Sequence, residues 1–184
     1  LLAYSTVAQL SYVVMAAAVL KPLSEVGAAI HMVAHAFGKI TLFFAAGAIY
    51  TAAKKTELHQ LRGIGRRMPW TMGAFTVGAL SMIGVPPTAG FVSKWYILAG
   101  SFQAENLLAI FTIIGSTALN AAYFLPIIYT AWFAPEPAGS KEHGEAPPLV
   151  VLALTCTALL TLGFFFFNGP VIELESQLVR GVTP

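Results

Sequence analysis

The stretch His31-Met-Val-Ala-His35-Ala-Phe-Gly-Lys39 places three titratable side chains at intervals of four residues inside an apolar segment. Apart from these three, no residue between Val26 and Tyr50 is ionisable, and the segment is long enough to cross a lipid bilayer. Four residues of an α-helix make slightly more than one turn and rise about 6 Å, so the three groups form a stripe along one face. Ionisable groups at membrane depth are costly and commonly belong to ion pathways or proton relays. The stretch therefore predicts a membrane helix that carries a functional polar stripe.

The composition of the whole chain indicates an all-α integral membrane protein. Hydrophobic residues make up 57% of the 184 residues and charged residues only 10%, against about 25% charged residues in ordinary soluble domains. The mean hydropathy is +0.75. A chain of this length accommodates about five membrane spans of about 20 residues each. The formal net charge of +2 is too small to indicate a nucleic-acid partner.

The cysteine count excludes two further classes of site. Cys156 is the only cysteine and lies in an apolar run, so the sequence contains neither a disulfide framework nor a cysteine metal centre. We expect no metal site, no cofactor and no catalytic residue in this chain. The chain begins at Leu1 without a methionine, and we expect that an N-terminal part precedes it.

Apolar runs and helix-breaking residues divide the chain into five expected membrane crossings. We expect spans at about residues 1–20, 25–50 and 69–84, a discontinuous span in which 88–102 is joined to 107–133, and a last span at 149–167. Val85-Pro86-Pro87 ends the third span, because proline interrupts helices. Broken helices at membrane depth occur where protein or water surrounds them, and transporters use them at ion sites. Residues 1–168 then form one transmembrane unit, and residues 169–184 form a polar tail.

The connection between the second and third spans is strongly basic. It contains five Lys and Arg residues and one acidic residue, Glu57. The five basic residues are Lys54, Lys55, Arg62, Arg66 and Arg67. Cytoplasmic connections of membrane proteins carry an excess of Lys and Arg, so we expect this connection in the cytoplasm. The polar connection Pro135–Pro148 then lies on the same side.

The stripe of His31, His35 and Lys39 has a structural and a functional interpretation. A single histidine in a membrane helix often only hydrogen-bonds a neighbouring carbonyl, but two histidines and a lysine on one face are harder to explain in this way. Lys39 lies about 14 residues into its helix, too deep for its ammonium to reach the membrane interface easily. Burial disfavours a charged ammonium, and histidine titrates near neutrality. We therefore predict that these three groups exchange protons through intervening water.

Lys94 is the second candidate for proton transfer. It follows the Pro-Pro break in a short half-helix, although a lysine beside Trp95 and Tyr96 also fits an interfacial aromatic belt. Four further residues are candidates for the lining of a polar path, with packing between helices or an interfacial position as the alternative. They are Tyr4, Ser5, Gln9 and Glu105.

Three segments of the chain resemble the antiporter-like subunits of the NADH:quinone oxidoreductase and Mrp-type cation/proton antiporter superfamily. Leu2-Ala-Tyr-Ser-Thr-Val-Ala-Gln-Leu-Ser-Tyr12 resembles the helix start LAYSTxxQxGY. His31 to Gly47 resembles the helix HxxxHAxxKxxLFxxxG, and Gly84-Val-Pro-Pro-Thr-Ala-Gly-Phe-Val-Ser-Lys94 resembles GxPPxxGFxxK. The three matches follow one another in the family's order through the first hundred residues, which makes chance agreement unlikely.

The resemblance implies an architecture and roles for particular residues. Members have about fourteen helices, with two inverted repeats of five, each containing a discontinuous helix. This chain would be the second, C-terminal repeat, with Thr88–Phe133 as its broken helix, and the family's first repeat is absent from it. The stripe of the second span corresponds to the central relay of the family, and Lys94 to the broken-helix lysine. Lys94 and Trp95 together favour an N-type or Mrp D-type subunit, since M-type subunits have Glu at the first position and L-type subunits often an acid at the second.

The resulting prediction is a proton-translocating subunit that moves protons along His31, His35, Lys39 and Lys94, with exchange for Na⁺ or K⁺ left open. We expect it to act with other membrane subunits of a respiratory NADH dehydrogenase-like or Mrp-type complex in the bilayer of a bacterial or archaeal plasma membrane. We expect no redox chemistry in the chain itself. Two alternatives remain open: a structural membrane subunit that transports nothing, and a solute permease with a site at the broken helix.

Overall fold

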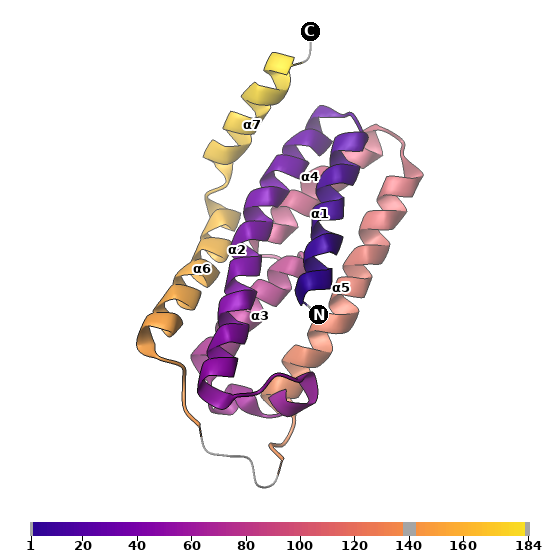
Figure 1. Ribbon diagram of the computed structural model, residues 1–184. Helices are drawn as coiled ribbons and strands as arrows, with labels where there is room; N and C mark the ends of the chain where they lie inside the picture. The colour runs from indigo at the N-terminus through magenta and orange to yellow at the C-terminus, as the bar shows by residue number, and fades with distance from the viewer. Residues whose placement is uncertain (1, 138–142, 183–184) are drawn as a thin grey trace.

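The longest helix, α2 (Pro22–Ala53, 32 residues), is the axis around which most of the other helices pack. This computed structural model describes residues 2–137 and 143–182, and these residues form helices and no strand. Five helices contact α2: α1 (Leu2–Ala18), α3 (Pro69–Ile83), α4 (Ala89–Gln103), α6 (Pro148–Phe166) and α7 (Gly169–Val182). α5 (Leu107–Phe133) lies beside α1, α3 and α4 (Figure 1). The all-α fold expected from composition is confirmed.

Within the described part of the chain, three helices are long and apolar enough to cross a membrane by themselves: α2, α5 and α6. α1 is apolar and has 17 residues, which corresponds to a length of about 25 Å. α3 and α4 have 15 residues each, or about 22 Å, which is shorter than the hydrocarbon core of a bilayer, about 30 Å. Each of these two is therefore half of a span.

The two half-helices α3 and α4 follow one another in the same direction along α2 (Figure 1). Their combined length of about 45 Å is close to the length of α2, about 48 Å. α5 runs back in the opposite direction after a short connection at 104–106 (Figure 1). The discontinuous span of this structure is therefore made of α3 and α4, which differs from the expected joining of 88–102 to 107–133.

The chain keeps its direction from α3 to α4 because of the backbone at residues 84–90. Gly84 ends α3 at φ +91°, a left-handed conformation that glycine adopts without steric cost, and Pro86–Pro87 is a cis peptide bond. The start of α4 then touches the last turn of α3. A Cβ atom at Gly90 would lie 1.8 Å from the carbonyl oxygen of Ser81, so only glycine permits this backbone contact.

A sharp reversal separates α4 from α5. Glu105 has a positive φ of 52°, and the side chain of Asn106 accepts a hydrogen bond from the backbone N–H of Ala109 at 3.1 Å. This side-chain cap satisfies one of the free N–H groups at the start of α5. In sequence, this polar interruption and the Pro-Pro break look alike, because both interrupt an apolar run. In the structure, the chain keeps its direction across the Pro-Pro break and reverses at the polar interruption (Figure 1).

Residues 54–68, 134–137 and 143–147 lie at one end of the molecule, which we call the connection end (Figure 1). Arg67 Nε lies 2.8 Å from Glu136 Oε2. Glu145 Oε1 accepts from the backbone N–H groups of Trp70 at 2.7 Å and Thr71 at 3.3 Å, and its Oε2 accepts from the Thr71 hydroxyl at 2.7 Å. A carboxylate from one connection therefore caps the N-terminus of α3, which begins at the other connection.

The segment after α6 forms a helix where a polar tail was expected. α7 contacts α2, and its residues Val171 and Ile172 pack beside an apolar cluster that includes Val26, Ile30 and Phe164. The apolar side chains of the first turn of α7 therefore extend the apolar packing of α2 and α6.

Candidate functional site

The stripe predicted on the second span lies on a buried face of α2. His31, His35 and Lys39 have exposed fractions of 1%, 8% and 5%. The rings of His31 and His35 are nearly parallel, with their centroids 6.3 Å apart. The spacing of four residues thus produces a continuous line of titratable groups within the bundle, as expected for one face of a helix.

His31 connects this line to α4. Its Nδ1 lies 2.8 Å from the hydroxyl oxygen of Ser93, the residue before Lys94. Ser93 Oγ also lies 3.1 Å from the carbonyl oxygen of Gly90, so this hydroxyl joins the His31 ring to the backbone of α4. Which of the two ring nitrogens carries the proton depends on the tautomer of the imidazole.

Lys94 binds the C-terminal end of α3. Its Nζ donates to the carbonyls of Met82 and Ile83, both at 2.9 Å, and lies 3.4 Å from Thr117 Oγ1. The last carbonyls of a helix lack partners within the helix and carry its partial negative charge, so they suit an ammonium group. The Gly84 turn makes room for this side chain, because a Cβ there would lie 2.9 Å from Lys94 Cδ.

Lys39, at the other end of the stripe, also binds a backbone carbonyl. Its Nζ donates to the carbonyl of Leu2 at 3.0 Å, at the start of α1. Both buried lysines therefore use neutral oxygen atoms as partners. Among residues 2–137 and 143–182, the ion pairs with carboxylates involve His59 and Arg67 instead.

Three buried polar atoms near the stripe have no hydrogen-bond partner within the described part of the chain. They are Gln9 Oε1, His31 Nε2 and His35 Nε2. Gln9 Nε2 donates to the Met82 carbonyl at 3.2 Å, the same oxygen that binds Lys94. Buried polar atoms are nearly always satisfied, and ordered water is the common partner where protein groups are missing.

The structure divides the four residues expected to line a polar path. Ser5 and Gln9 are buried on the face of α1 that packs against the bundle. Tyr4 is 85% exposed. Glu105 is exposed in the turn between α4 and α5, away from the buried stripe. Ser5 and Gln9 are thus brought to the site by the fold, and Tyr4 and Glu105 are not.

Sequence reasoning missed the uncharged polar groups that surround Lys94. Tyr12 lies between Lys94 and His31, with its ring centroid 4.9 Å from Lys94 Nζ and 5.4 Å from the His31 ring. α5 contributes Ser116, Thr117, Asn120 and Tyr123 on the side that faces α1. Ser116, Asn120 and Tyr123 are spaced by four and three residues, and this spacing could have indicated that they share one face of a helix. We call Gln9, Tyr12, His31, His35, Ser93, Lys94 and Asn120 the polar centre.

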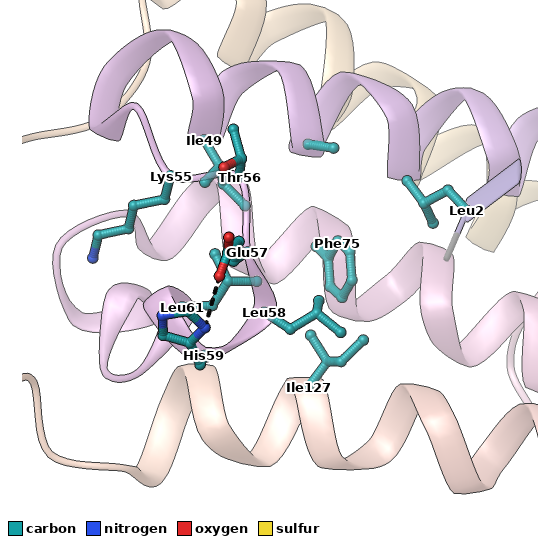
Figure 2. Close-up of a pocket in the computed structure, with 11 residues that line it drawn as sticks. Leu2, Ile49, Lys55, Thr56, Glu57, Leu58, His59, Leu61, Phe75 and Ile127 are labelled. Atoms are coloured by element: carbon teal, nitrogen blue, oxygen red, sulfur yellow. Dashed lines mark ion pairs between the residues drawn. The ribbon is translucent and has the colours of Figure 1, made fainter.

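A separate cavity of about 550 Å³ lies towards the connection end. Figure 2 shows its lining, with the ion pair between His59 Nδ1 and Glu57 Oε2 at 3.1 Å and the apolar side chains of Phe75 and Ile127. Leu2 also lines it, and the carbonyl of Leu2 is the acceptor for Lys39. The cavity therefore approaches the Lys39 end of the stripe and does not include the Lys94 contacts.

Comparison with known proteins agrees with this arrangement. The model of the family described as NADH:quinone oxidoreductase/Mrp antiporter, transmembrane part, matches residues 1–120. The chain belongs to this family. Residues 1–120 contain every member of the polar centre, so the matched region and the candidate site coincide. Together with the apolar helices, family membership identifies the chain as an integral membrane protein.

Relatives within the NADH:quinone oxidoreductase/Mrp antiporter family come from bacteria and archaea. Subunit N of the NADH-quinone oxidoreductase of Desulforudis audaxviator is 41% identical over 150 residues, which cover 80% of this chain and 30% of that protein. Subunit N of the F420H2 dehydrogenase of Methanosarcina mazei is 32% identical over 194 residues, which cover 100% of this chain and 39% of that protein. The chain thus spans about a third of the length of the curated relatives it matches.

Solved structures of membrane complexes share the fold. A chain of the Mrp complex from Dietzia sp. superposes with a TM-score of 0.85 at 21% identity, covering 98% of this chain and 42% of that one. A chain of respiratory complex I from Thermus thermophilus gives a TM-score of 0.81 at 20% identity, covering 97% of this chain and 39% of that one. The helical arrangement around the polar centre is therefore a known membrane fold.

Proposed function

We propose that this chain is part of a proton-translocating membrane subunit and that protons move along Lys39, His35, His31 and Lys94. One observation carries the proposal. Four buried titratable groups follow one another from α2 to α4, and their described partners are carbonyl, hydroxyl and aromatic groups instead of carboxylates. Ionisable groups in this setting are costly for stability and are typical of proton pathways.

The local contacts support each step of this path. His35 and His31 stack along α2, and the free Nε2 atoms of both rings, together with Gln9 Oε1, are the groups between which buried water would carry a proton. The hydrogen bond from His31 to Ser93 brings the imidazole next to the helix turn that carries Lys94. Lys94, which lies on α4 and binds the carbonyls at the end of α3, is then the last group of the proposed path.

The working assembly is a larger membrane complex. Relatives are named as subunits N of an NADH-quinone oxidoreductase and of an F420H2 dehydrogenase, and a structural neighbour belongs to an Mrp complex. In such an assembly, other membrane subunits supply the driving force, either redox chemistry or a cation gradient. This chain contributes the proton path and performs no redox step.

Proton flux in vesicles that contain the full-length protein in its complex tests the proposal. Lys94→Met and Lys39→Met each remove a charge from the path, and flux per assembled complex should fall at least about tenfold. Lys54→Met is the matched control, because Lys54 is exposed at the connection end. Unchanged flux in both path variants would overturn the proposal, and loss of assembly in both without a defect in assembled complexes would favour a structural subunit.

The same vesicles test whether protons exchange for Na⁺ or K⁺. Flux that requires one of these cations on the opposite side supports exchange, whereas equal flux in a choline buffer contradicts it. Driving the complex with its electron donor instead of a cation gradient separates a redox-driven pump from an Mrp-type antiporter.

A further inference from the structure

Tyr12 occupies the junction between the two parts of the proposed proton path. It is 3% exposed on α1, with its ring edge-on to His31 at 5.4 Å between centroids. The same ring lies under Lys94, whose Nζ is 4.9 Å from the ring centroid. Tyr12 is thus the described side chain in contact with both the α2 stripe and the α4 lysine.

The ring face of Tyr12 adds a cation–π interaction to the hydrogen bonds that Lys94 makes with carbonyl groups. An aromatic ring attracts a cation within about 6 Å of its centroid, and the attraction grows when water is excluded. A neutral amine gains far less from this interaction, because the attraction depends on the charge. With the carbonyls of Met82 and Ile83 on the same ammonium, the ring completes a cage that favours the charged side chain.

The hydroxyl of Tyr12 is fixed from the opposite direction by α5. The Tyr12 hydroxyl and Ser116 Oγ are hydrogen-bonded at 2.6 Å, and Ser116 Oγ also lies 2.5 Å from the Thr112 carbonyl oxygen. Asn120 Nδ2 in turn donates to the Tyr12 oxygen at 3.4 Å. The hydroxyl of Tyr12 is therefore held by two side chains of α5, Ser116 and Asn120.

The rest of this network holds α5 against α1 and does not extend a proton path. Tyr123 donates to Asn120 Oδ1 at 2.5 Å and lies 2.9 Å from Ser5 Oγ. An amide such as Asn120 neither releases nor takes up a proton at neutral pH, so the chain of hydrogen bonds is interrupted there. Its physical effect is to lock the orientation of the Tyr12 ring.

We propose that Tyr12 is a positioning residue of the proton path: its ring face holds the charged Lys94 side chain beside His31, and its hydroxyl, anchored on α5, keeps the ring in that orientation. This inference rests on the proposed function, since it concerns the geometry of the same path. It assigns the ring a role that the hydroxyl does not share.

Three variants of the full-length protein in its complex test this assignment by proton flux per assembled complex. Tyr12→Leu and Tyr12→Met remove the aromatic ring, and flux should fall about tenfold or more. Tyr12→Phe keeps the ring face, and flux should stay within about threefold of the wild type. Methionine adapts its shape to an irregular site, so Tyr12→Met provides a second ring-free variant if Tyr12→Leu packs poorly and fails to assemble.

Tyr50→Leu is the matched control. Tyr50 forms the same kind of contact, with Lys54 Nζ 5.0 Å from its ring centroid, but it is exposed on α2 outside the polar centre. Flux of this variant should equal that of the wild type. Wild-type flux in Tyr12→Leu and Tyr12→Met overturns the proposal, and so does an equal loss in Tyr12→Phe, which would make the hydroxyl the important group. Loss of flux in Lys94→Met alongside either result leaves the proposed function intact.

Discussion

The polar centre and the connection end stabilise charge in different ways. At the connection end, Arg67 is paired with Glu136 at 2.8 Å and His59 with Glu57 at 3.1 Å. In the polar centre, Lys94 is bound by two carbonyls and an aromatic ring. The first arrangement places a carboxylate beside Arg67 and beside His59, and the second, among the described residues, places no carboxylate beside Lys94.

This difference matters when a group changes its charge. If one member of a buried ion pair becomes neutral, the other is left as an uncompensated charge, at a cost of several kcal/mol. If Lys94 becomes neutral, its partners are the neutral carbonyls and the Tyr12 ring, and no charge is stranded. The pair of Arg67 and Glu136 suits a cation that stays charged, whereas the partners of Lys94 suit a cation that can lose its charge.

The largest effect is expected when a carboxylate is placed beside Lys94, because the polar centre then stabilises charge in the same way as the connection end. Thr117 Oγ1 lies 3.4 Å from Lys94 Nζ, so Thr117→Asp creates an ion pair there. Two unit charges at 4 Å attract by about 4 kcal/mol at an effective dielectric constant of about 20, which holds the lysine charged. Proton flux per assembled complex in vesicles should fall at least about tenfold.

Thr117→Asn is the control for this substitution. It has nearly the same size and polarity as Asp but no charge, and its flux should remain close to that of the wild type. Equal flux in Thr117→Asp and Thr117→Asn would contradict the view that the polar centre depends on neutral partners for Lys94.

A medium effect on stability, without an effect on flux, is expected at the connection end. Glu145→Ala removes the acceptor for the N–H groups of Trp70 and Thr71 at the start of α3. Loss of a helix N-cap costs about 1 kcal/mol, which a denaturant titration of the full-length protein measures. Glu145→Gln keeps one acceptor oxygen and should lose less. A drop in flux per folded complex would show that the two regions are not separate.

The smallest expected effect concerns pH at the connection end. Burial lowers the pKa of His143 below its ordinary value near 6.5, and repulsion from Lys55 and Arg67 acts in the same direction. The folded state therefore favours neutral His143, so this contribution to stability is present above pH 6.5 and is lost as the pH falls below it. Between pH 7.5 and 5.5, the melting temperature of the wild type should fall more than that of His143→Asn.

One result would contradict the prediction for His143. Equal changes in melting temperature for the wild type and His143→Asn would mean that the imidazole does not change its charge preference on folding. The variant also separates this histidine from His59, which is exposed beside Glu57.

The sequence pattern predicted the stripe well, because the spacing of His31, His35 and Lys39 depends only on helix geometry. All three lie on one buried face of α2. The wrong partner for the half-helix 88–102 has a physical cause. A Pro-Pro break and a polar turn both interrupt an apolar pattern, and only the packing of Gly90 on Ser81 shows which one continues the span.

The residues that sequence reasoning missed are uncharged. Tyr12 and Asn120 occur in apolar helices where a tyrosine or an asparagine has many ordinary roles, and their position beside Lys94 depends on how α1 and α5 pack. Glu105 shows the opposite error, since its charge drew attention although it lies exposed in a turn. Charge marks costly positions in a membrane helix, but the neutral neighbours of a charge follow only from the fold.

The carbonyl of Met82 has two donors, Lys94 Nζ at 2.9 Å and Gln9 Nε2 at 3.2 Å. When the lysine swings away, the amide remains, so this oxygen keeps one of its bonds. Without the lysine, the Ile83 carbonyl and Thr117 Oγ1 lose their contacts with Nζ, whereas the Met82 carbonyl keeps the Gln9 donor. The Gln9 amide therefore lowers the cost of moving the ammonium group at one of its two carbonyl acceptors, because that oxygen stays hydrogen-bonded.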